Sequence, residues 1–189
     1  MKKKKTTKKQ TLTGPTYLTI LRMLLSVLFV VFVQMPEMWA KITALVVFTI
    51  GALTDKIDGI WARKKKLVTD MGAFLDPLAD KMLVDLAFLV LVYLNVIPLW
   101  VFAVIIVRDL AVDGMRMMVA RDGVTVAASF YGKLKTTMQM IALFIIQLNL
   151  IVPSDFLNIT GNIILYIALA LTVYSGMDYL VKGYQVVIK

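Results

Sequence analysis

Six long apolar segments follow one another along this chain of 189 residues, and they limit its fold more than any other feature. Each is long enough to cross a bilayer, which takes about 20 residues of helix. Hydrophobic residues make up 60% of the chain and the mean hydropathy is +0.82, values typical of integral membrane proteins. The sequence therefore predicts an all-α, polytopic membrane protein with six transmembrane helices. The segments are 17–35, 40–61, 73–94, 97–119, 133–152 and 158–181.

Short polar or proline-containing breaks separate these segments, at Met35-Pro36, residues 63–66, Asn95 with Pro98, residues 121–123 and residues 153–155. We expect one membrane domain over residues 14–189, preceded by a basic tail over residues 1–13. Lysines precede the first apolar segment, as in a signal peptide. However, the segment is long, no A-x-A-like cleavage site follows it, and five more spans come after, so we interpret it as an uncleaved helix.

The distribution of basic residues predicts the orientation of the bundle. An even number of spans places both termini on one side of the membrane. The connections 34–39, 95–98 and 151–158, which lie on the opposite side, contain no lysine or arginine. Because basic residues stay on the cytoplasmic side, both termini are predicted to be cytoplasmic in a multi-pass protein of the cell membrane.

The net charge of +9 predicts a negatively charged binding partner, either nucleic acid or anionic lipid. Nucleic-acid binding would need a soluble domain to present that charge, and the sequence contains none. Attraction to anionic lipid headgroups, worth about 1 kcal/mol per basic residue near the surface, is the favoured use.

Four aspartates, Asp55, Asp58, Asp76 and Asp80, lie inside the second and third apolar segments. An ionised carboxylate near the middle of a bilayer costs on the order of 3 kcal/mol unless it is partnered, so such acids are candidates for function. At about 100° per residue, the first two share one helix face and the last two share a face of the next helix. A link over residues 63–71 lets the helices run antiparallel, so the two faces can meet near the cytoplasmic surface.

Converging carboxylates require cations. The chain has no histidine or cysteine, which excludes zinc sites built on those ligands. Oxygen ligands suit hard divalent cations, Mg²⁺ first, with Mn²⁺ or Ca²⁺ as alternatives. Structural salt bridges to Lys56, Arg63 and Lys81 are the competing interpretation, but acids within membranes are far more often functional.

Small residues accompany the aspartates on the same helix faces, at Gly59, Ala62 and Gly72. Such positions allow a bulky polar ligand to lie against the helix backbone. Close packing of helices through small residues explains them equally well when they are considered alone. Their alternation with aspartates favours a nucleotide.

Basic residues form a second group in the later segments. Arg108 and Arg116 are just over two helical turns apart, so both can face one polar cavity. Lys133 and Lys135 lie at the cytoplasmic start of the fifth segment. Arginine forks combined with lysine charges suit a phosphate monoester. For the two lysines, snorkelling to lipid headgroups is the alternative.

The spacing D-x2-D-G-x2-A-R-x8-G-x3-D-x3-D over residues 55–80 resembles the signature of the CDP-alcohol phosphotransferases. The blocks LDPLADK (75–81), RDLAVDGMR (108–116), GKLKT (132–136) and SGMDY (175–179) are similar to those of the bacterial phosphatidylglycerophosphate synthases within that family. The resemblance covers residues 14–185, almost the whole chain.

This resemblance implies a transferase that moves the phosphatidyl group from CDP-diacylglycerol to glycerol 3-phosphate, giving phosphatidylglycerol phosphate and CMP by Mg²⁺-dependent in-line displacement. It implies two metal ions on Asp55, Asp58 and Asp76, with Asp80 reaching one metal and serving as the catalytic base. It also implies a homodimer. The CDP-diacylglycerol site would comprise Gly59, Ala62, Arg63 and Gly72, and the glycerol 3-phosphate site Arg108, Arg116, Lys133 and Lys135.

Two alternatives remain. Other members of the family use inositol phosphate, serine or phosphatidylglycerol as the acceptor. A cation transporter would also place acids in helices, but it would need them near mid-membrane with an exit pathway, and it would have no use for the aspartate motif beside a basic pocket.

Several acids depart from the family pattern or have no place in it. Asp109 stands where the family usually has glutamate. Asp113 either orients Arg116 through a helical ion pair or cancels part of the positive charge of the pocket. Asp178 is expected to pair with a basic residue of the site. Asp85 lies off the face of the metal aspartates, and the sequence assigns it no role.

Overall fold

Six α-helices form the part of the chain that the computed structural model describes, residues 14–65, 70–121 and 130–187. No strand occurs within these ranges, so the predicted all-α class is confirmed for them. Within the helices, side chains are described except at residues 14–16, 18, 55–65, 70–78, 80, 119–121 and 182–187. The helices are α1 (Gly14–Val33), α2 (Met38–Lys65), α3 (Asp70–Tyr93), α4 (Leu99–Arg121), α5 (Phe130–Ile151) and α6 (Asp155–Val187).

Each predicted break coincides with the end of a helix, although α2 ends later than its apolar segment. Proline-containing turns follow α1 and α5, and α4 ends at Arg121, all as expected. However, α2 continues through Arg63 to Lys65, into the basic run that was predicted to interrupt it. Arginine and lysine are good helix formers, and no glycine or proline interrupts this run, so a change from apolar to basic residues does not by itself end a helix.

Asn95 ends α3 in a Schellman motif. Its φ of 57° lies in the left-handed region, which asparagine tolerates better than most residues. The N–H of Asn95 donates to the carbonyl of Val92, and the N–H of Val96 donates to the carbonyl of Leu91, both at 2.9 Å. These two bonds satisfy the last carbonyls of the helix, and Pro98 then prevents the chain from continuing it.

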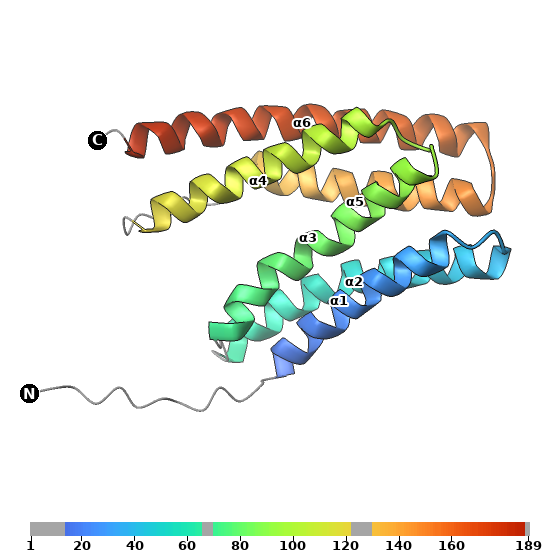
Figure 1. Cartoon of the computed structure of the whole chain (residues 1–189), viewed down its shortest axis with the longest axis horizontal. Helices are drawn as coiled ribbons and strands as arrows, with labels where there is room; N and C mark the ends of the chain where they lie inside the picture. Colours follow the sequence, from blue (N-terminus) through green and yellow to red (C-terminus); the bar gives the residue numbers. More distant parts are fainter. Residues whose placement is uncertain (1–13, 66–69, 122–129, 188–189) are drawn as a thin grey trace, which may run out of the picture.

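The helices pack as two groups of three (Figure 1). Helices α1, α2 and α3 form one group, and α4, α5 and α6 form the other, with α2 against α5 as the main contact between them. The turns between α1 and α2, α3 and α4, and α5 and α6 all lie at one end of the bundle in Figure 1. Sequential helices are therefore antiparallel.

Large apolar side chains form the core of the bundle. Phe29 of α1 and Phe48 of α2 are buried with their ring centroids 5.8 Å apart, and Phe88 of α3 is fully buried. Gly51 allows α2 to approach α3 closely, because a Cβ at that position would lie 2.8 Å from a methyl carbon of Leu83.

The outer surface of the bundle is apolar, whereas polar side chains are buried inside it. Leu24, Leu28 and Val31, for example, are exposed along α1. This inverted distribution is typical of a protein whose solvent is lipid. Buried polar residues include Thr19, Arg22, Ser26, Lys135, Gln139, Gln147, Thr172 and Ser175.

Two of the described helices are long and apolar enough to cross a membrane, α5 over its whole length and α6 over Asp155–Val181, with mean hydropathies of 1.4 and 1.9. Thr19–Val33 and Met38–Thr54 are shorter apolar stretches of the same kind. The number of spans predicted from the sequence, six, stays a prediction.

Candidate active site

A polar cavity of about 380 Å³ lies between α3, α4, α5 and α6. All four residues predicted to bind a phosphate line it, so the expectation that Arg108 and Arg116 face one cavity is confirmed. The charged residues of its wall are Lys81, Arg108, Arg116, Lys133 and Lys135 together with Asp85, Asp109 and Asp113. Among these described residues, positive charges exceed negative ones by two.

Helical spacing explains how these side chains reach one cavity. Asp109, Asp113 and Arg116 follow one another at intervals of four and three residues, which places them on one face of α4. Lys81 and Asp85 are one turn apart on α3. The cavity therefore receives one charged face from α4 and another from α3.

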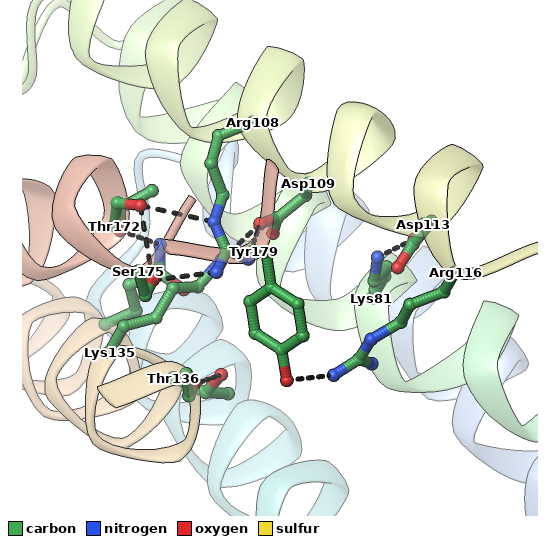
Figure 2. A network of polar contacts seen from close by, with 12 residues as sticks. Lys81, Arg108, Asp109, Asp113, Arg116, Lys135, Thr136, Thr172, Ser175 and Tyr179 are labelled. Carbon is green, nitrogen blue, oxygen red and sulfur yellow. Dashed lines mark hydrogen bonds and ion pairs between the residues drawn. The ribbon is translucent and has the colours of Figure 1, made fainter. Parts of the chain in front are cut away.

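Three separate contacts fix the guanidinium group of Arg108 (Figure 2). Its Nε donates to the carbonyl oxygen of Thr172 at 3.2 Å, and one terminal nitrogen donates to Ser175 Oγ at 2.7 Å. The other terminal nitrogen donates to Asp109 Oδ1 at 2.9 Å. Gly176 makes this possible, because a Cβ there would lie 2.7 Å from Cγ of Arg108. The arginine is therefore held between α4 and α6.

Asp109 also pairs with Lys135 of α5. The lysine is only 3% exposed, and its ammonium group is bonded inside the bundle rather than directed to the lipid headgroups. Snorkelling is therefore excluded for Lys135, while Lys133 is exposed at the rim of the cavity. The acid that departs from the family pattern holds two of the predicted phosphate-binding residues in place.

Arg116 is oriented by Tyr179 of α6. Its Nη2 donates to the tyrosine hydroxyl at 2.7 Å, and its guanidinium carbon lies 4.8 Å from the ring centroid, within the range of a cation–π interaction. Asp113 instead pairs with Lys81 of α3 (Figure 2). Of the two roles considered for Asp113, the helical ion pair with Arg116 is thus replaced by two contacts between different helices.

The sequence missed the roles of Lys81, Thr172, Ser175 and Tyr179 at this site. Ser175 and Tyr179 lie in the block SGMDY, whose similarity to the family was a signal without an assigned function. From the sequence, Lys81 is a candidate salt-bridge partner only for the four aspartates of the predicted metal site. Its actual partner, Asp113, lies 32 residues further along the chain, on another helix.

The four predicted metal ligands lie where α2 ends and α3 begins. Asp55 is ten residues before the end of α2 and Asp80 is ten residues after the start of α3, so in antiparallel helices they lie at similar depth. Asp58 and Asp76 lie closer to the same ends. The side chains of these aspartates, and those of Gly59, Ala62, Arg63 and Gly72, lie outside the described part of the chain.

The donor set is nevertheless defined by the sequence. Four carboxylates on two consecutive helices, in a chain without histidine or cysteine, suit a hard divalent cation. Lys81, the residue after Asp80, lines the cavity, so the segment of α3 that carries the aspartates adjoins the basic site.

The family model of the CDP-alcohol phosphatidyltransferases matches residues 12–174, from the start of α1 into α6. The chain belongs to this family. Its members are generally metal-dependent and associated with membranes.

Individual members of the family are similar over nearly the whole chain. The CDP-diacylglycerol–glycerol-3-phosphate 3-phosphatidyltransferase of Bacillus subtilis (strain 168) is 36% identical over 184 residues, which cover 90% of this chain and 95% of that protein. The enzyme of the same name from Sodalis glossinidius is 39% identical over 171 residues, covering 88% and 92%. A probable phosphatidylglycerophosphate synthase of Mycobacterium tuberculosis (strain H37Rv) is 38% identical over 144 residues, covering 76% and 67%.

The arrangement around Asp109 predicts an asymmetry between two ion pairs. In Asp109→Asn, the nearly buried Lys135 loses its counter-ion, which should lower the free energy of unfolding by about 3–5 kcal/mol. Asp113→Asn breaks a pair whose side chains are 36% and 40% exposed, so the loss should be only about 0–1 kcal/mol. Thermal unfolding of the purified variants in detergent measures both effects. Equal melting temperatures for the two variants would contradict this account of the site.

Proposed function

We propose that this protein is an enzyme that transfers the phosphatidyl group of CDP-diacylglycerol to glycerol 3-phosphate, releasing CMP and forming phosphatidylglycerol phosphate. The observation that carries this proposal is the similarity, at 36–40% identity, to transferases that bear this activity in their names and are covered over more than nine-tenths of their length. The basic cavity supports it independently, because its excess of two positive charges complements the dianion of a phosphate monoester.

The cavity also bears on the choice of acceptor. Arg108 and Arg116 offer planar forks to a phosphate, and Lys133 adds a mobile point charge at the rim. Serine carries no phosphate and would leave these cations without a ligand. Inositol phosphate and phosphatidylglycerol remain the alternative acceptors within the family.

The aspartates of α2 and α3 form the proposed catalytic centre. Asp55, Asp58 and Asp76 would be the principal ligands of two Mg²⁺ ions, for which Mn²⁺ would substitute, and Asp80 would be a further ligand. When bound, the metals stabilise negative charge on the phosphoryl oxygens and on the departing CMP.

Asp80 has a second role, as the base. It takes the proton of the attacking hydroxyl, whose oxygen forms the new bond to the phosphatidyl phosphorus. The phosphoanhydride bond to CMP breaks in the same step, and CMP leaves with the bonding electron pair. Arg63 holds the diphosphate through its fork, while Gly59, Ala62 and Gly72 leave room for the CDP group along the helices.

The proposed enzyme crosses the cell membrane six times, with both termini and the active site facing the cytoplasm. Several features support this topology. The three turns at one end of the bundle carry no lysine or arginine, and Trp39, Tyr93 and Trp100 are exposed beside them, as expected of residues at a membrane interface. Arg116 and Lys133 lie towards the opposite end, near the end of α4 and the start of α5.

The remaining proposals concern organisation and partners. Residues 14–189 form one membrane domain, and the basic tail over residues 1–13 associates with anionic headgroups. Two copies form a homodimer, as the family resemblance implies.

A panel of acceptors tests the proposed reaction. The purified chain in detergent, supplied with CDP-diacylglycerol and Mg²⁺, should release CMP with glycerol 3-phosphate and not with inositol phosphate, serine or phosphatidylglycerol. Release with one of the other acceptors and none with glycerol 3-phosphate would overturn the assignment.

The metal site gives a further prediction. Asp55→Asn, Asp58→Asn and Asp76→Asn should each lower turnover by about a hundredfold or more, because each removes an anionic ligand from a site that stabilises charge. EDTA should abolish CMP release, and Mg²⁺ or Mn²⁺ should restore it. Asp80→Asn should abolish turnover while CDP-diacylglycerol still binds. Full activity after exhaustive chelation would show that the reaction needs no metal.

Substitutions at the rim of the basic cavity should weaken the use of glycerol 3-phosphate and leave the binding of CDP-diacylglycerol unchanged. Arg116→Ala removes a charged hydrogen-bonding fork, worth about 1.5–3 kcal/mol, and should lower kcat/KM for glycerol 3-phosphate roughly ten- to hundred-fold. Lys133→Ala should cost less, because this exposed lysine is well solvated. Lys41→Ala, near the opposite end of the bundle, is the control. Unchanged kinetics for Arg116→Ala, or an equal change in the KM for CDP-diacylglycerol, would exclude this cavity as the acceptor site.

A further inference from the structure

Asp85 is a charged residue of the cavity that the proposed reaction does not yet use. It lies one helical turn after Lys81 on α3, is half-buried, and lines the same cavity. Charged groups that line the same cavity and act on it electrostatically come from three helices: Lys81 on α3, Asp109 on α4 and Lys135 on α5. It therefore lies deeper in the bundle than the Lys81–Asp113 pair, towards the buried end of the cavity.

The other two acids of the cavity are already engaged. Asp109 accepts hydrogen bonds from Arg108 and Lys135, and Asp113 pairs with Lys81. Among the residues whose side chains the structure describes, none forms an ion pair or a hydrogen bond with the carboxylate of Asp85. Lys81 and Lys135, the two cations that act on it electrostatically, are thus each paired with a different acid.

A half-buried carboxylate that faces another carboxylate and has no donor is unfavourable, and such groups usually have a specific explanation. A ligand that donates a hydrogen bond to it would remove that penalty. The five cations of the cavity can supply donors only, so they suit a phosphate but cannot accept a hydrogen bond from a hydroxyl. Asp85 is the carboxylate of the cavity that no described donor occupies, so it can accept a hydrogen bond from a hydroxyl of the acceptor molecule.

We propose that Asp85 accepts a hydrogen bond from the hydroxyl of the acceptor that does not react, so that the cavity selects phosphate monoesters carrying a second hydroxyl. The inference rests on the proposed function and specifies how its acceptor is recognised. Glycerol 3-phosphate has the three groups that such a site requires: a phosphate for the cations, a terminal hydroxyl that attacks phosphorus, and a hydroxyl between them for Asp85.

Recognition of this kind works mainly by rejection. An acceptor without the middle hydroxyl leaves the carboxylate unpaired beside Asp109, and sites built to bond a substrate hydroxyl discriminate strongly against analogues that lack it. 3-Hydroxypropyl phosphate is such an analogue, since it keeps the phosphate and the terminal hydroxyl of glycerol 3-phosphate and lacks only the middle one.

The test compares these two acceptors in the purified full chain, with CDP-diacylglycerol and Mg²⁺ and CMP release as the readout. Wild type should prefer glycerol 3-phosphate by at least about a hundredfold in kcat/KM. Asp85→Ala should lower kcat/KM for glycerol 3-phosphate about ten- to hundred-fold and raise that for 3-hydroxypropyl phosphate, because the carboxylate that this analogue leaves unpaired is removed. Asp85→Asn keeps the size of the side chain and a neutral acceptor oxygen, so it should fold like wild type and lose less of the preference.

Two controls separate this inference from its alternatives. Asp155→Asn, at the exposed start of α6, should leave the preference unchanged. If wild type releases no CMP with glycerol 3-phosphate, the proposed function itself fails. If wild type is active but Asp85→Ala and Asp85→Asn slow both acceptors equally, or neither, Asp85 serves only the structure or the charge balance and the inference is wrong.

Discussion

The arrangement of charged side chains in the cavity depends on the contacts that the carboxylate of Asp109 makes with Arg108 and Lys135. The carboxylate accepts hydrogen bonds from Lys135 of α5 and from Arg108 of its own helix. The same arginine donates hydrogen bonds to the carbonyl oxygen of Thr172 and to the hydroxyl of Ser175, both on α6. One acid therefore joins three helices inside the bundle, where most of its polar neighbours are buried. In such surroundings an unpaired charge is costly, so each partner keeps the others in a defined position. Arg108 and Lys135 are therefore oriented before any ligand arrives.

This network also explains the division of the charged residues around the cavity. Residues deep in the bundle, such as Lys135, are tied to other protein groups, whereas Lys133 at the rim is exposed. A phosphate that enters from the rim meets the exposed Lys133 and Arg116 first and the fixed fork of Arg108 further in. Pre-oriented forks lose little conformational freedom on binding, which favours both affinity and a single orientation of the acceptor.

The number and approximate positions of the helices could be predicted from the sequence, because hydropathy and segment length are properties of each stretch of chain by itself. It also placed Arg108 and Arg116 in one cavity, since spacing along a helix determines which residues share a face. The contacts between helices could not be obtained in this way. The pairing of Asp113 with Lys81 rather than with Arg116 depends on how α3 and α4 are rotated against each other, and spacing within one helix carries no information about that rotation.

The end of α2 illustrates the same limit at a smaller scale. The basic run after Arg63 marks where the chain leaves the apolar region, but the helix continues to Lys65, because backbone hydrogen bonding does not depend on the polarity of the side chains. A change of environment and the end of a helix are separate events, and composition reports only the first. For Asp55, Asp58, Asp76 and Asp80, the shared depth in α2 and α3 follows from the helix bounds, and their roles rest on the chemistry of carboxylates.

Helix α6 holds both arginines, Arg108 through Thr172 and Ser175, and Arg116 through Tyr179. Thr172 and Tyr179 are seven residues, or about two turns, apart, so they lie on the same side of the helix. They stay on that side only if the number of residues between them does not change. Inserting or deleting one residue between Ser175 and Tyr179 would rotate the tyrosine by about 100° relative to the serine and release one of the two arginines. Over evolution, the outward side chains of this segment are free to change as long as they stay apolar, whereas its length is fixed.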